Sequence, residues 1–176
     1  AYMRKGDYDR AIQDYDQAVR LNPNYSLAFR NRGVTQFYRG EFAAAEADFS
    51  KVLLGSQEAY YLVWLYLAQS RGGNNQARDH LADRAKALDL DDWPGPIISM
   101  YLGRIRPQEA MEAAVGKNPM KETEMQCQVY FHIGQLLLME GRKNEAVQTF
   151  KAAIATGASA SYEYNGAKAE LKRMGY

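Results

Sequence analysis

The sequence has very few of the residues that build disulfides and metal sites. It contains one cysteine, Cys127, and two histidines, His80 and His132, that stand 52 residues apart. A disulfide needs a second cysteine, and a structural zinc site needs about four closely spaced Cys or His ligands. The sequence therefore predicts no intrachain disulfide, no metal site and no cofactor held by such ligands.

Excess charge and long apolar runs are also absent. Lysine and arginine number 22 against 21 aspartates and glutamates, which gives a net charge of +1. Nucleic-acid binding depends on a clustered excess of Lys and Arg. The longest nearly continuous apolar run, residues 59–68, has ten residues, about half of the roughly 20 that span a bilayer. We therefore expect no nucleic-acid partner and no transmembrane segment.

No group of residues suggests an active site. His80 has Asp83 one helical turn away and could act as a base, but such a histidine is more often an exposed helix residue. His132 is expected to pack or to face a groove. Cys127 lacks a neighbouring base or second thiol, so it is expected to be buried as a small apolar side chain. The sequence predicts that the protein is not an enzyme.

The acidic run at residues 89–92 raises the question of a calcium loop. It lacks the central glycine and the distal glutamate of an EF-hand, and it offers too few ligands. We instead expect its carboxylates to cap a helix that begins near Pro94, because anions stabilise the free N–H groups of a helix N-terminus.

One pattern recurs along the whole chain. It is anchored on alanines separated by 34, 32, 33 and 36 residues, namely Ala11, Ala45, Ala77, Ala110 and Ala146. The three clearest copies read Gly6-x-Tyr8-x-x-Ala11-x-x-x-Tyr15, Gly40-x-Phe42-x-x-Ala45-x-x-x-Phe49 and Gly141-x-Lys143-x-x-Ala146-x-x-x-Phe150. A fixed period of this length indicates a repeat architecture.

A second element precedes two of these copies. It reads Phe29-x-x-Arg32-Gly33-x-x-Gln36 and Tyr130-x-x-Ile133-Gly134-x-x-Leu137. This spacing places the large residues on one helical face and leaves the glycine where a neighbouring helix can approach closely. The pattern predicts the tail of a helix ending near residue 5, then helices over 8–21, 26–39, 42–54, 58–70, 74–88, 95–103, 107–116, 122–140, 143–156 and 160–174.

The paired pattern resembles the tetratricopeptide repeat, or TPR, whose unit of 34 residues is a helix–turn–helix. The resemblance implies an all-α fold: a solenoid of antiparallel helix pairs in a right-handed superhelix, with a C-terminal capping helix. We expect one TPR-like domain over residues 1–176. Its divisions would be a partial repeat (1–24), a repeat (25–57), a divergent repeat (58–91), a degenerate hairpin (92–119), a repeat (120–157) and a capping helix (158–176).

Parts of the sequence are similar to the NlpI-type TPR lipoproteins of Gram-negative bacteria. The similarity lies at Trp93-Pro94, Tyr101-Leu102-Gly103 and residues 130–134. It implies a homodimeric periplasmic adaptor that is anchored by a lipidated cysteine upstream of Ala1 and brings cell-wall hydrolases to a protease. The first residues are expected to be the tail of a helix that begins earlier, in a fragment of a longer chain. If the similarity does not hold, a cytoplasmic location is expected.

TPR proteins bind partner segments on the concave face that the first helix of each pair lines. By spacing, the residues pointing into this groove are Arg4, Arg30, Val34, Phe37, Tyr38, Leu62, Tyr66, Gln69, Phe131, Gln135 and Leu138. Aromatic residues and arginines are typical anchors of interfaces. The sequence therefore predicts a scaffold or adaptor for a protein or peptide. The alternatives are that these residues face solvent or another protomer, or that the chain is a regulatory module of a larger enzyme or assembly.

Overall fold

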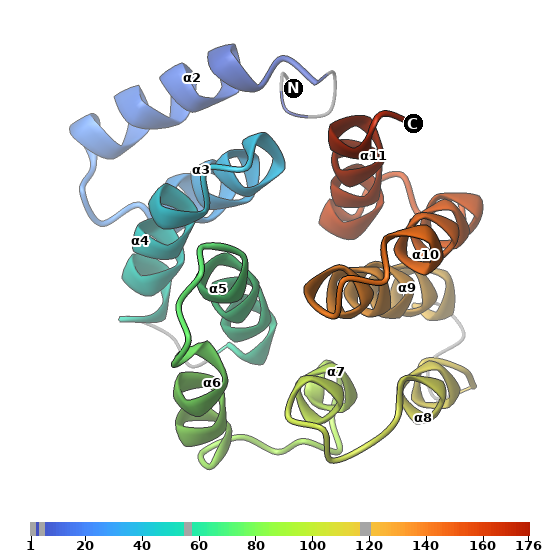
Figure 1. The fold of residues 1–176 in the computed structure, drawn as a ribbon. Helices are drawn as coiled ribbons and strands as arrows, with labels where there is room; N and C mark the ends of the chain where they lie inside the picture. Colours follow the sequence, from blue (N-terminus) through green and yellow to red (C-terminus); the bar gives the residue numbers. More distant parts are fainter. Residues whose placement is uncertain (1–2, 4–5, 55–57, 117–120) are drawn as a thin grey trace. The chain divides into compact units, whose positions relative to one another are not determined.

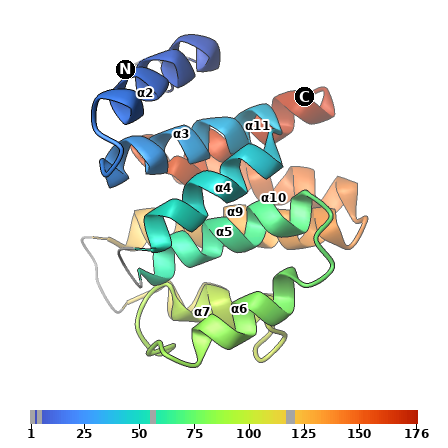
Figure 2. The ribbon, with the colours of Figure 1, turned by 90° about the vertical axis from the view of Figure 1, so that its left-hand side faces the viewer.

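The first half of the chain folds into a stack of helices. The computed structural model describes residues 3, 6–54, 58–116 and 121–176, and it divides into two compact units, 1–88 and 89–176. Unit 1 holds α2 (Tyr8–Leu21), α3 (Ser26–Arg39), α4 (Phe42–Leu53), α5 (Ala59–Arg71) and α6 (Ala77–Ala85). Within this unit, each helix from α2 to α5 packs against the next one along the chain (Figures 1 and 2). Consecutive packing is the arrangement of a helical repeat.

Unit 2 follows the same principle with two short helices at its start. It holds α7 (Gly95–Tyr101), α8 (Pro107–Ala113), α9 (Glu122–Met139), α10 (Lys143–Ala155) and α11 (Tyr162–Met174). The long α9 packs against both α10 and α11 (Figure 1). The described residues contain helices and no strand, which confirms the predicted all-α repeat fold. The predicted helix tail before residue 6 falls mainly on residues that the structure leaves undescribed.

The helix ends lie where the local chemistry predicts them. The Asp7 carboxylate caps α2 by accepting a hydrogen bond from the N–H of Arg10 at 3.3 Å, and the Ser161 hydroxyl caps α11 in the same way. Gly40 ends α3 with a φ of 83°, a left-handed conformation that glycine adopts without strain. The one large deviation is α6, predicted over 74–88 but confined to Ala77–Ala85.

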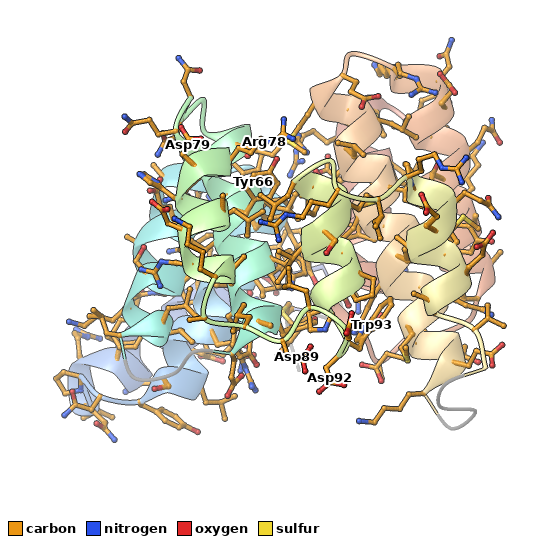
Figure 3. All side chains as sticks on the ribbon, turned by 90° about the horizontal axis from the view of Figure 1, so that it is seen from below. Tyr66, Arg78, Asp79, Asp89, Asp92 and Trp93 are labelled. Atoms are coloured by element: carbon orange, nitrogen blue, oxygen red, sulfur yellow. The ribbon has the colours of Figure 1, made fainter. Side chains whose placement is uncertain are left out.

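The helix predicted to follow the acidic run begins where the sequence places it. The helix α7 starts at Gly95, directly after Pro94, and the capping role of the carboxylates before it stays a prediction. The Asp89 carboxylate accepts the N–H of Asp91 at 2.9 Å, which forms a local turn within the acidic run. In Figure 3, Asp92 and Trp93 lie in the segment that leads into α7.

The core of each unit is built on the repeat pattern. In α3 and α9, Gly33 and Gly134 lie against the rings of Phe49 and Phe150, the aromatic residues of the next helix. These two rings and the repeat alanines Ala45 and Ala146 are fully buried. The glycine therefore lets each second helix approach its first helix closely, as the sequence predicts.

Candidate functional site

An ion cluster ties α2, α3 and α4 of unit 1 together. Arg32 of α3 donates two hydrogen bonds of 2.7 Å to the carboxylate of Asp48 in α4, and a third of 2.7 Å to Asp16 in α2. Burial raises the pKa of Asp48, and the Arg32 guanidinium opposes that rise. Because the fork of an arginine matches a carboxylate in both distance and direction, the cluster fixes the register of these helices.

The predicted groove residues of α3 lie at the interface between α3 and α5. Trp64 of α5 is fully buried, as the ring centroids of Phe37 and Tyr38 lie 5.3 and 6.4 Å from its own. Val34 is fully buried as well. Arg30 is only half-buried, and it donates a hydrogen bond of 2.6 Å to the hydroxyl of Tyr61. Of the four predicted residues on α3, Arg30 is therefore the one that a partner can reach without repacking.

The three predicted groove residues of α5 meet at a hollow of about 340 Å³. Leu62, Tyr66 and Gln69 line its floor, while Ser50 of α4 and residues of α6 form its walls. The Gln69 amide donates to Glu46 of α4 at 3.0 Å, which holds this side chain in place. The hollow thus lies between the second helices α4 and α6, whereas the expected groove was formed by first helices.

The predicted groove residues of unit 2 take part in packing on α9. The Phe131 ring is fully buried with its centroid 5.9 Å from that of Phe150. The Gln135 amide donates to Glu170 of α11 at 2.9 Å, so it joins two helices. Leu138 is half-buried. Arg4 lies outside the described residues, and the binding role of the whole set stays a prediction.

Six residues at the hollow were not predicted from the sequence as part of the binding surface: Ser50, Leu65, His80, Leu81, Asp83 and Arg84. Sequence reasoning considered only the first helices of each pair, so the α4 and α6 walls were missed. The signal that could have found them is Leu81, which stands where the clearer copies of the repeat have Phe49 and Phe150.

Two buried titratable groups of unit 2, His132 and Cys127, lie beside hydroxyl groups. His132 is buried, and burial lowers its pKa to about 3. The Tyr101 hydroxyl donates to the backbone carbonyl of His132 at 3.0 Å and lies 3.0 Å from its Nδ1. Burial raises the pKa of Cys127, whose sulfur lies 3.5 Å from the Ser161 hydroxyl. At neutral pH the His132 imidazole is therefore neutral and the Cys127 thiol is protonated.

Other kinds of site find no support in the described parts of the chain. Within residues 6–54, 58–116 and 121–176, no three His, Cys, Asp or Glu side chains are grouped so that they could hold a metal ion. Among the helices that the structure describes, none is both long and apolar enough to cross a membrane.

Comparison with known proteins agrees with this architecture. Residues 1–40 match a TPR repeat family, and residues 128–155 match a second tetratricopeptide repeat family. The chain is similar to the lipoprotein NlpI homolog of Haemophilus influenzae, with 30% identity over 171 residues. This alignment covers 96% of the chain and 54% of the relative, so the chain spans about half the length of the curated protein it matches. The two matches show that the chain contains tetratricopeptide repeats, and the relative supports the resemblance of the chain to lipoproteins of the NlpI type.

Proposed function

We propose that this protein is a non-catalytic scaffold that binds a segment of a partner protein. The observation that carries the proposal is the repeat packing at Gly33–Phe49 and Gly134–Phe150, because preformed repeat helices are the elements on which TPR proteins display binding surfaces. Such a surface lowers the cost of association, since only the partner segment has to become ordered.

The narrower proposal is that of a periplasmic adaptor that brings cell-wall hydrolases to a protease. The similarity to the NlpI homolog supports it, as do the residues 130–134 and Trp93-Pro94 on which the resemblance rests. On this proposal the full-length protein carries a lipid anchor upstream of Ala1 and works as a homodimer. Arg30 and Leu138, the half-buried members of the predicted groove set, are proposed to touch the partner.

The test is quantitative affinity purification from the source organism with the full-length protein and two charge-reversal variants. Arg30→Glu changes the half-buried arginine of α3, and Arg20→Glu makes the same change on the exposed face of α2. We expect wild type and Arg20→Glu to recover a protease or a cell-wall hydrolase, and Arg30→Glu to lose it. Tyr38→Ala is unsuitable here because Tyr38 is buried, so truncation would destabilise the fold.

Three outcomes separate the levels of the proposal. Equal recovery by Arg30→Glu would remove this residue from the binding surface. Recovery of partners that are neither proteases nor cell-wall enzymes would contradict the adaptor role and keep the scaffold. Failure of every form to recover any partner protein would contradict the scaffold itself. Circular dichroism of both variants checks that the helices persist.

A further inference from the structure

The third helix pair departs from the packing rule of the other clear repeats. In the clear repeats, the glycine of the first helix and the phenylalanine of the second are 16 residues apart, as in Gly33–Phe49 and Gly134–Phe150. The equivalent positions of α5 and α6 hold Leu65 and Leu81. A Cβ at Gly134 would lie 2.5 Å from the Phe150 ring, so the close approach depends on glycine. Leu65 instead places a large side chain between the helices, and Leu81 fills less space than a phenyl ring. Both leucines line the hollow.

The second helix of this pair also covers less of its partner. The helix α6 has 9 residues against 12 in α4 and 13 in α10. Its buried stripe consists of Ala77, Leu81 and Ala85, two of which are the smallest apolar side chains. By contrast, nine successive residues of α5, 61–69, are buried and predominantly apolar. A short helix with small contacts leaves a hollow beside this part of α5.

This hollow and a neighbouring one form a continuous feature, which we call the α5–α6 groove. The hollow of about 340 Å³ adjoins a second of about 140 Å³ that Leu53, Ala87 and Leu88 also line. The two hollows share Leu62, Asp83 and Arg84. In Figure 3, Tyr66 of the groove floor lies beside the start of α6. The larger hollow reaches the size of ordinary ligand pockets, about 300–1,000 Å³.

Charge at the rim distinguishes one kind of ligand from another. The Asp83 carboxylate accepts a hydrogen bond of 2.7 Å from Lys86, and the pair lowers the pKa of Asp83. Arg84 is exposed at the junction of the two hollows and makes no ion pair or hydrogen bond with any residue in the described part of the chain. The groove therefore combines apolar side chains with one available guanidinium. The guanidinium is suited to pair with a carboxylate of the ligand.

We propose that the α5–α6 groove binds a short peptide segment in which apolar side chains flank an aspartate or glutamate. The apolar side chains occupy the two hollows, and the carboxylate pairs with Arg84 between them. This inference rests on the proposed scaffold function and assigns to it a site between second helices. An acidic segment is favoured over a basic one because Asp83 is already paired with Lys86 while Arg84 has its guanidinium available.

The test uses fluorescence anisotropy with three labelled peptides of ten residues. They are identical, with leucines on one side and phenylalanine on the other, except that the central pair is Glu-Glu, Gln-Gln or Lys-Lys. We expect the full chain to bind the Glu-Glu peptide about tenfold more tightly than the Lys-Lys peptide, since attraction is replaced by repulsion. The variant Arg84→Glu is expected to reverse this order.

A matched control is available within unit 1. Arg20 and Arg84 both lie in the last turn of their helices. Arg20→Glu therefore makes the same change of charge and has the same destabilising effect of an anion at a helix C-terminus. Arg20→Glu should keep the wild-type order of peptides. Ala87 is exposed at the second hollow, and Ala87→Trp should weaken all three peptides by filling it. Circular dichroism confirms that each variant folds.

The outcomes decide the proposal in both directions. The groove is supported if Arg84→Glu reverses the order of peptide affinities and Ala87→Trp weakens the binding of all three peptides. The proposal is overturned if Arg84→Glu leaves the order of peptide affinities unchanged, or if the wild-type protein binds none of the peptides. Partner capture that Arg30→Glu abolishes but Arg84→Glu and Ala87→Trp leave intact would overturn the groove and retain the scaffold. If the wild-type protein captures no partner at all, the scaffold itself is rejected.

Discussion

At the scale of a single residue, burial changes the protonation of His132. The ring lies in the core of unit 2, close to the Tyr101 hydroxyl and 5.2 Å, centroid to centroid, from the Phe131 ring. Desolvation penalises the charged imidazolium, which is why its pKa falls to about 3. In the unfolded chain the same histidine has a pKa of about 6.5.

This difference predicts an acid dependence of stability. Between the two pKa values the unfolded chain binds the proton and the folded chain does not, so stability is complete above about pH 6.5 and falls as the pH drops toward 3. Urea unfolding should therefore show a loss of roughly 2–3 kcal/mol from about pH 7.5 to about pH 4.5 that His132→Gln largely removes. His80→Gln, at the exposed histidine, is the control. A slope that persists unchanged in His132→Gln would contradict the assignment.

At the scale of an element, the glycine of each first helix sets how near the second helix lies. A Cβ at Gly134 would meet the buried Phe150 ring at 2.5–2.9 Å, whereas at Gly33 the nearest atoms lie at 3.2–3.3 Å. The first contact is prohibitive for a ring that cannot move, and the second requires a shift of a few tenths of an ångström. The two pairs therefore differ in tolerance although their sequence pattern is the same.

The two equivalent alanine substitutions should therefore behave differently. Alanine gains about 1 kcal/mol over glycine inside a helix, and overpacking costs about 1–3 kcal/mol. We expect Gly33→Ala to leave stability within about 0.5 kcal/mol of wild type, and Gly134→Ala to lower it by about 1–2 kcal/mol. Thermal unfolding of both variants measures this. Equal melting temperatures, or a larger loss for Gly33→Ala, would show that the pairs pack alike.

At the scale of the whole molecule, stability in a repeat protein is the sum of its helix pairs and their neighbouring interfaces. Unit 2 combines long and short elements. The helix α9 has 18 residues and packs against α10 and α11, whereas α8 has 7 residues and buries only Ala110. Local opening is easiest where little apolar surface is buried.

Hydrogen exchange should reveal this gradient. We expect amides of α8 to exchange at least about tenfold faster than those in the middle of α9, because opening α8 exposes less apolar surface. Mass spectrometry on peptides from each helix measures the rates under native conditions. Equal protection of the two helices would mean that they open only together.

Much of the secondary structure follows from local rules. The bounds of α2, α3 and α9 were predictable because a capping aspartate, C-terminal glycines and apolar periodicity act within a few residues of the chain. The period of the alanines also revealed the repeat family, since each copy must present the same small residue to its neighbour. The acidic run at 89–92 shows the limit of such rules, because a carboxylate there can either cap a helix or close a local turn, as Asp89 does with the N–H of Asp91.

The accessible surface was decided by tertiary packing. Spacing places Phe37, Gln135 and Leu62 equally on a helical face, yet the first lies against Trp64, the second binds Glu170 and the third lines a hollow. Which of these occurs depends on the distance between helices. That distance is determined by contacts such as the one between Gly134 and Phe150, which lie far apart along the chain. Periodicity reports which side of a helix is apolar, and only the assembled helices decide how much of that side remains open.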